Sequence, residues 1–194
     1  MNENSQKSKN VKDLNKKLSG KVLFLDRDNI NTDEIIPAKY LTEIDKEPLK
    51  KHLLEDLKLE GFVPSKINWS EYAAIITRKN FGCGSSREMA PWAFQVNGID
   101  IIIAQSFARI FKENAFNCGM LAIEFEKEDS EQIINSIFTE FASEPEVFIN
   151  VDINNLIIKL FTSSKERLIK FNLNKFEREL VLYGGWIELA SKKY

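Results

Sequence analysis

The sequence contains few of the side chains that most often bind metals or form disulfides. Its 194 residues include one histidine, His52, and two cysteines, Cys83 and Cys118. Two cysteines are too few for an iron–sulfur cluster or a structural zinc site, which usually have three or four protein ligands. A Ser-His-Asp triad would have to use His52, which lies in a charged amphipathic segment and is expected to face solvent. We therefore expect this chain to bind no metal, and we interpret both cysteines as reduced and structural.

The sequence also lacks an excess of charge and any long hydrophobic run. It has 27 Lys and Arg against 29 Asp and Glu, so nothing in it favours nucleic acid as a partner. No apolar run approaches the roughly 20 residues that cross a bilayer, so no membrane association is expected. Residues 1–19 are polar and lack the apolar stretch of a secretory signal. They predict a flexible tail, or in part a short helix around Val11–Leu18, and a cytoplasmic protein. Residues 20–194 are expected to form one domain.

Apolar runs that alternate with amphipathic segments predict an α/β fold. Strands are expected at residues 21–25, 72–77, 100–104, 120–125, 147–150 and 156–160. Helices are expected at residues 48–59, 88–97, 106–114, 130–141 and 176–182. Asn31, Thr32 and Asp33 can each cap a short helix before Pro37, and Asn154–Asn155 favour a hairpin turn. This order predicts a partly parallel sheet with flanking helices.

The segment Asn80–Glu88, NFGCGSSRE, lies between a predicted strand and a predicted helix. The carboxyl ends of strands are where α/β folds place their ligands. Its glycines permit positive φ and a close approach of the backbone to a ligand. The N–H groups of its serines, at the expected helix start, favour an anion, and Arg87 offers a planar guanidinium to a carboxylate or phosphate. The segment therefore predicts an anion-binding turn.

Other interpretations of this segment stay open or fit less well. In a purely structural turn, a serine caps the helix and Arg87 pairs with a surface acid. The Walker A pattern needs a lysine after its second glycine, and the dinucleotide pattern needs a third glycine. A nucleophile elbow would need glycine in place of Arg87.

Three blocks of sequence resemble the small subunit of 3-isopropylmalate dehydratase, which is similar to the swivelling C-terminal domain of aconitases. They are NINTDEIIPAKYL at 29–41, NFGCGSSRE at 80–88 and GIDIIIAQSFARIFKENAFNCG at 98–119, and they occur in the family's order. The resemblance covers roughly residues 20–190 and implies the swivelling β/β/α fold of that domain.

The resemblance implies a role for each matching residue. Ser85 matches the base that takes a proton from the carbon next to a substrate carboxylate. Ser86 and Arg87 match positions that hold a substrate carboxylate. Gly82 and Gly84 are assigned to the backbone turn on the conformational freedom of glycine instead. Asp33 matches an acid that orients a histidine of the partner chain.

The resemblance also implies a cofactor and a partner outside this chain. In this family a [4Fe–4S] cluster is bound by three cysteines of a large subunit, and its open iron acts as a Lewis acid on the substrate hydroxyl. We therefore expect no cofactor on this chain, activity only with the cluster-bearing large subunit, and a small hydroxy-diacid as substrate. The isolated chain could form homo-oligomers.

The loop that begins with Tyr40, Leu41 and Thr42 matches the family's specificity loop. Homoaconitase-like members often carry arginine after the Tyr-Leu pair, whereas this chain has Thr42. The difference favours isopropylmalate in leucine biosynthesis over homoaconitate, dimethylmalate or citrate-type acids. From a different class, a non-catalytic module that binds a carboxylate or phosphate at the same turn, or a structural or regulatory subunit, stays open.

Overall fold

The computed structural model describes residues 18–40 and 45–193. Their sheet has seven strands in the order β4-β3-β2-β1-β5-β6-β7. The first four run parallel: β1 (Ser19–Leu25), β2 (Tyr72–Thr77), β3 (Ile101–Ala104) and β4 (Leu121–Glu124). The last three pair antiparallel: β5 (Phe148–Asp152), β6 (Ile157–Phe161) and β7 (Glu166–Lys170). The expected α/β fold with a partly parallel sheet is confirmed.

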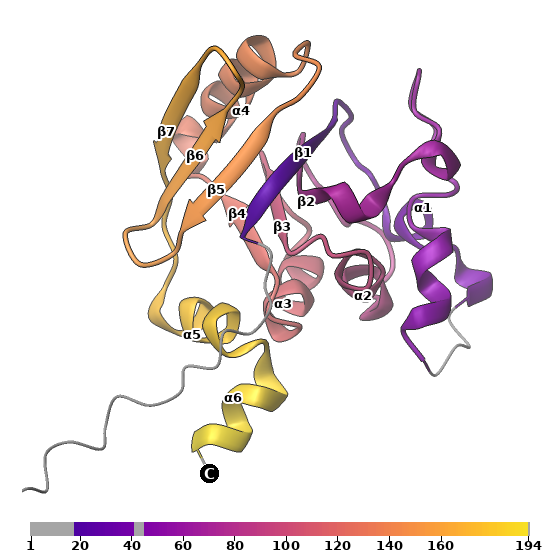
Figure 1. Ribbon diagram of the computed structural model, residues 1–194. Coiled ribbons are helices and arrows are strands. Elements are labelled where there is room, and N and C mark those ends of the chain that lie inside the picture. The colour runs from indigo at the N-terminus through magenta and orange to yellow at the C-terminus, as the bar shows by residue number, and fades with distance from the viewer. Residues whose placement is uncertain (1–17, 41–44, 194) are drawn as a thin grey trace, which may run out of the picture.

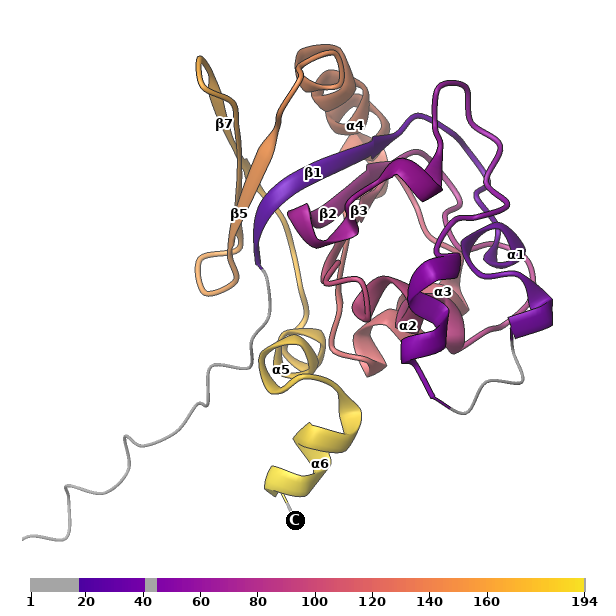
Figure 2. The ribbon, with the colours of Figure 1, turned by 45° about the vertical axis from the view of Figure 1, so that its right-hand side comes forward.

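Six α-helices accompany this sheet in the described residues. They are α1 (Thr32–Ile35), α2 (Met89–Gln95), α3 (Arg109–Asn117), α4 (Lys127–Phe141), α5 (Lys175–Tyr183) and α6 (Trp186–Lys193). Figure 2 shows α4 on one side of β1–β3, with α2 and α3 on the other. Figure 1 shows α1 and the antiparallel strands on opposite sides of the molecule. No helix in the described ranges is long and apolar enough to span a membrane.

Local sequence signals account for several of these boundaries. Asn31 caps α1, because its side chain accepts from the Glu34 N–H while the Glu34 carboxylate accepts from the Asn31 N–H. Gly184 ends α5 with φ 92°, in the left-handed region that glycine adopts at low cost. β3 is buried along its whole length, as its run of isoleucines predicts for a strand covered on both faces.

The leucine-rich segment 48–59 does not form the predicted helix. A 3₁₀ helix covers Glu47–His52, and turns follow it. Leu54 has φ 57°, and its N–H donates to the carbonyl of Ile35 at 3.0 Å, so the chain bends toward α1. All four leucines of the predicted stripe are still buried: Leu49, Leu53, Leu54 and Leu57. The leucine periodicity thus predicted correctly which side chains are buried, but not the backbone conformation, which includes the contact of Leu54 with Ile35.

Other boundaries also differ from the sequence expectations. α3 starts at Arg109 rather than at residue 106, because residues 106–108 extend the pairing of neighbouring loops. The sequence reading missed β7 and α6, which follow a turn at Thr162–Lys165 and the Gly184–Gly185 pair. β1 begins at Ser19, one residue before the expected domain start. The rest of the expected tail, residues 1–17, lies outside the described residues. Shorter 3₁₀ helices occupy Ala38–Tyr40, Pro64–Lys66 and Trp69–Glu71.

Candidate active site

Three loops that follow β1, β2 and β3 are joined by backbone hydrogen bonds. The loop after β1 meets the loop after β2, where the Thr32 N–H donates to the Cys83 carbonyl and the Gly82 N–H to the Ile30 carbonyl, each at 2.8 Å. The loop after β2 meets the loop after β3, because the Ala108 N–H donates to the Phe81 carbonyl at 2.9 Å. Parallel strands bring these three connections to one edge of the sheet, although 76 positions separate Thr32 from Ala108 in the sequence.

Two asparagines reinforce this junction. Asn29 and Asn80 both have φ 56°, a left-handed conformation that asparagine tolerates better than most residues. The Asn80 side-chain amide donates to the Asn29 side-chain carbonyl at 2.8 Å. The Asn80 N–H donates to the Ser106 hydroxyl at 2.8 Å. Asn29 and Asn80 thus connect all three loops next to the start of the glycine–serine turn.

Gly82 is required where the turn passes over an aromatic cluster. It has φ 75°, and a Cβ at this position would lie 2.2 Å from Cγ of Phe111. The Phe111 ring packs edge-on against Phe81, with ring centroids 5.2 Å apart, and Phe94 and Phe107 complete the cluster. Phe81, Phe94 and Phe111 are buried, so the turn rests on a rigid apolar floor.

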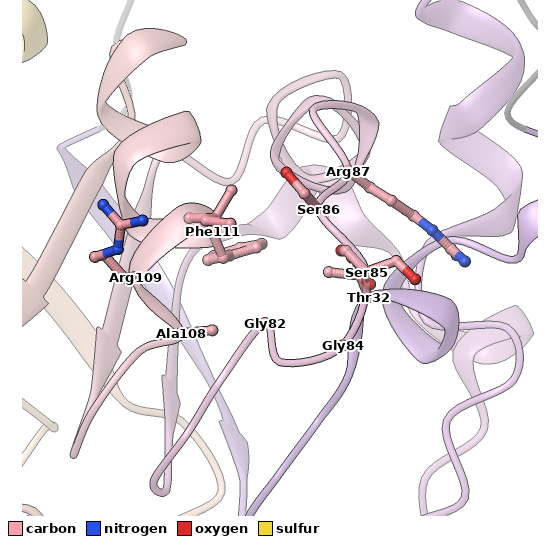
Figure 3. A pocket seen from close by; sticks show the side chains of 10 residues that line it. Thr32, Gly82, Gly84, Ser85, Ser86, Arg87, Ala108, Arg109 and Phe111 are labelled. Atoms are coloured by element: carbon pink, nitrogen blue, oxygen red, sulfur yellow. Dashed lines mark hydrogen bonds between the residues drawn. The ribbon is translucent and has the colours of Figure 1, made fainter.

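Five of the residues singled out from the sequence line one cavity of about 210 Å³ beside this floor. These five are Gly82, Gly84, Ser85, Ser86 and Arg87, and the other lining residues are Thr32, Ala108, Arg109, Ile110 and Phe111. Figure 3 shows the serines on one flank of the cavity and Arg109 on the other. Ser85 and Ser86 are both exposed. The Thr32 hydroxyl donates to the Ser85 carbonyl at 2.9 Å and so fixes the turn against α1.

Arg87 and Asp33, which the sequence reading placed in different roles, contact each other. The Arg87 Nη2 lies 2.6 Å from the Asp33 Oδ1, and the Arg87 Nη1 donates to the Ile36 carbonyl at 3.2 Å. The Arg87 side chain is 10% exposed, whereas that of Asp33 is 56% exposed. The guanidinium is therefore covered, whereas the carboxylate is open to solvent.

The helix after the turn begins later than expected. α2 starts at Met89, its N-cap is Glu88, and no side chain caps it. Ser85 and Ser86 lie in the preceding connection, so the structural alternative in which a serine caps this helix is wrong. The other part of that alternative, a pairing of Arg87 with a surface acid, is present as the contact with Asp33. The helix N-terminus contributes less to the turn than the sequence reading assumed.

Tyr40 lies outside the cavity lining, and Leu41 and Thr42 lie outside the described residues. The Tyr40 ring stacks on His52, with ring centroids 3.6 Å apart. The expectation that His52 faces solvent is wrong, because its side chain is 17% exposed and its Nδ1 lies 2.5 Å from a Glu55 carboxylate oxygen. Burial alone would raise the pKa of Glu55, but hydrogen bonds from Lys39 and His52 outweigh it and lower that pKa.

Comparison with known proteins shows the family of this chain. Residues 12–128 match the aconitase C-terminal domain. The 3-isopropylmalate dehydratase small subunit of Caldicellulosiruptor bescii is 44% identical over 84% of this chain and 89% of its own length. That of Thermodesulfovibrio yellowstonii is 39% identical over 91% of this chain and 95% of its own length. The chain belongs to the aconitase C-terminal domain family and, within it, to the 3-isopropylmalate dehydratase small subunits.

A solved structure supports the assignment at the level of the fold. The 3-isopropylmalate dehydratase structure from Methanocaldococcus jannaschii superimposes with a TM-score of 0.70 at 30% identity. The match covers 91% of this chain and 94% of that one. The agreement therefore extends along most of the chain and is not confined to the segment around the glycine–serine turn. The architecture is that of the aconitase C-terminal domain family.

The cavity of this family member includes residues that the sequence reading did not assign to the site. Thr32 was considered only as a helix cap, and Arg109 and Ile110 only as part of a helix. The order of the parallel strands was the signal that could have found them. β3 lies beside β2, so the loop after β3 must lie beside the glycine–serine turn.

The described residues offer no cluster of the side chains that most often bind metals. Within residues 18–40 and 45–193, no three His, Cys, Asp or Glu side chains gather in a group that could hold a metal ion. Cys83 lies beside Gly82 in the turn, whereas Cys118 follows the far end of α3. Burial raises the pKa of the Cys83 thiol, which opposes formation of a reactive thiolate. These donors do not fit an iron–sulfur cluster.

Proposed function

We propose that this chain is the small subunit of a 3-isopropylmalate dehydratase. This hydro-lyase interconverts 2-isopropylmalate and 3-isopropylmalate by dehydration and rehydration, a step of leucine biosynthesis. The main support is that Ser85, Ser86 and Arg87 line one cavity, in a chain that matches such small subunits over most of its length. In this proposal the chain acts with a larger subunit, which completes the open side of the cavity.

Ser85 is the proposed base. It takes a proton from the carbon next to a substrate carboxylate, while the electron pair of that C–H bond forms the double bond and the hydroxyl group departs. A serine hydroxyl is a poor base in water, so its alkoxide must be stabilised. Ser85 is exposed and lines the cavity, which supports the role, since a docking subunit can exclude water there.

The remaining side chains of the site bind and orient. In the proposal Arg87 and Ser86 hold a substrate carboxylate, and Asp33 orients a histidine of the large subunit. The exposed Asp33 carboxylate beside Arg87 supports this, because a partner side chain can reach it. The proposal assigns the choice among substrates to the loop that begins with Tyr40, Leu41 and Thr42, on the resemblance of its sequence alone.

The Lewis-acid chemistry belongs to the partner in this proposal. A [4Fe–4S] cluster on the large subunit would polarise the substrate hydroxyl group. This chain would supply the base, the carboxylate contacts and one wall of the cavity. Its own two cysteines play no part in that cluster.

Reconstitution tests the proposal. The pure chain should show no interconversion of the isopropylmalates, and turnover should appear when a cluster-loaded large subunit is added. Ser86→Ala should reconstitute with a smaller loss of kcat than Ser85→Ala. Turnover by the pure chain without iron would refute the dependence on a partner. A stable partnerless protein that binds diacids without turnover would favour a non-catalytic binding module.

Thr42→Arg tests the choice of substrate. An isopropyl group needs an uncharged wall, and a buried arginine beside it would lack a partner. With the large subunit present, the variant should lose kcat/KM for isopropylmalate and gain it for homoaconitate, which has an additional carboxylate. Equal effects on the two substrates would remove this loop from the specificity argument while leaving the role of Ser85 untouched.

A further inference from the structure

Arg87 is turned toward Asp33 rather than toward the cavity whose rim it forms. Figure 3 shows its guanidinium pointing away from Phe111 and Gly82, opposite in direction to the Ser86 hydroxyl. The two terminal nitrogens are both engaged, one by the Asp33 carboxylate at 2.6 Å and the other by the Ile36 carbonyl at 3.2 Å. A substrate carboxylate that uses the same fork must compete with Asp33 for it.

We propose that Asp33 occupies the carboxylate site of Arg87 in the separate chain and is handed to a cationic side chain of the large subunit on assembly. This inference rests on the proposed function. Asp33 is suited to the exchange because it is the first acidic residue of α1 and its side chain is 56% exposed, so a partner cation can reach it from outside. Arg87 is suited because its side chain is largely covered and its Nη1 also donates to the Ile36 carbonyl, which retains the guanidinium when the carboxylate leaves.

The exchange couples two binding events. While Asp33 pairs with Arg87, the free subunit binds a substrate carboxylate weakly. Once the partner's cation takes Asp33, the guanidinium is open to the substrate, so assembly precedes tight binding of the carboxylate. The Asp33 carboxylate thus has two roles. In the free chain it covers Arg87 and keeps the chain from sequestering diacids, and in the assembled enzyme it orients a partner group.

The free full-length chain tests the masking by Asp33. Malonate is titrated against wild type, Asp33→Asn and Asp26→Asn, and binding is followed through the Nε–H signal of Arg87 at constant ionic strength. Asp26 is the matched control, because its carboxylate is 64% exposed and pairs at 2.5 Å with a largely covered arginine, Arg78, outside this cavity. We expect Asp33→Asn to tighten malonate binding by roughly two- to fivefold, the range of a partly exposed ion pair. Asp26→Asn should leave the affinity unchanged.

Two outcomes would overturn the inference. Equal or weaker malonate binding by Asp33→Asn would mean that Asp33 positions Arg87 for its ligand instead of masking it. A gain that survives Arg87→Ala in the Asp33→Asn background, followed there by calorimetry because the Arg87 signal is gone, would mean that the malonate binds elsewhere.

The assembled enzyme gives a second measurement. There, Asp33→Asn should lower kcat, because the partner's group loses its orienting carboxylate, while KM for isopropylmalate stays the same or falls. A raised KM would again indicate positioning and overturn the proposal. Failure of the proposed function is separable, because it would appear as absent turnover of the reconstituted wild type, whatever the free chain does with malonate.

Discussion

The parallel and antiparallel parts of the sheet differ in the burial of their strands and in the sequence separation of the contacts that their loops make. β2 and β3 are almost wholly buried, whereas β5 and β6 alternate buried positions with more exposed ones. The loops after the parallel strands are bonded to one another across long sequence separations, as Thr32 is to Ser85. The antiparallel turns are held by near neighbours, as Asp152 holds Asn154 and Asn155.

This difference shows why the candidate site lies where it does. Parallel strands direct their carboxyl ends to one edge, so loops from distant sequence positions converge and can assemble a cavity. Antiparallel strands send successive turns to opposite ends, so each hairpin closes on itself. Substitutions in the two parts should therefore separate chemistry from stability.

Ser85→Ala should have the largest effect on turnover. Loss of a general base lowers kcat by roughly 10²–10⁴-fold, with a modest effect on KM. Steady-state kinetics with the large subunit would measure it, and Ser86→Ala is the control with the smaller effect on kcat. Near wild-type kcat in Ser85→Ala would show that the convergence of loops serves structure alone.

Gly82→Ala should damage both activity and stability, because the new methyl group would overlap Phe111 in a left-handed backbone conformation. Gly61→Ala is a matched control, since Gly61 has φ 73° and nothing within 4 Å of the added Cβ. The control should lose roughly 1–2 kcal/mol from backbone strain, and Gly82→Ala roughly 1–3 kcal/mol more from overpacking. Denaturant unfolding measures both, and equal losses would mean that Phe111 moves aside freely.

Leu160→Ala should lower stability without changing the chemistry. Leu160 is fully buried on β6 in the antiparallel part, so its truncation should cost roughly 2–5 kcal/mol of unfolding free energy. Below the unfolding transition, kcat of the reconstituted enzyme should match wild type. Leu168→Ala, at a 63% exposed position on β7, should change stability by about 0.5 kcal/mol or less. A fall in kcat without unfolding would couple the hairpins to the site.

Asp152→Ala should have the smallest effect and should depend on pH. The Asn155 backbone N–H, then the Asn155 side-chain amide, lower the pKa of Asp152. A lowered folded-state pKa stabilises the protein above the unfolded value of about 3.9, and this contribution is lost as pH falls through the folded value. The difference in Tm from wild type should thus be present at neutral pH and shrink in acid. Asp152→Asn should keep some of the hydrogen bonds of the turn, but its stability should lack this pH dependence. A Tm difference between Asp152→Ala and wild type that stays the same from neutral pH into acid would contradict the lowered pKa of Asp152.

Much of the fold could be predicted from local pattern. The strands 72–77 and 156–160, the Asn31 cap and the hairpin turn at Asn154–Asn155 follow from features that neighbouring residues carry themselves. Segment 48–59 failed because its helical periodicity was real but Leu54 bonds to Ile35, a contact outside the segment. β7 was missed because its pattern is weak at a sheet edge, where an apolar residue, Leu168, is exposed together with Glu166 and Lys170.

The same distinction divides the site. The sequence by itself determined the chemical groups and their immediate order: the glycines that allow the turn, the two serines, and the arginine after them. Only the tertiary structure decided that Thr32 and Phe111 would border that turn and that Asp33 would pair with Arg87. Local sequence sets dihedral preferences and which faces are apolar. The order of parallel strands sets which loops meet, and that order arises from packing over the whole chain.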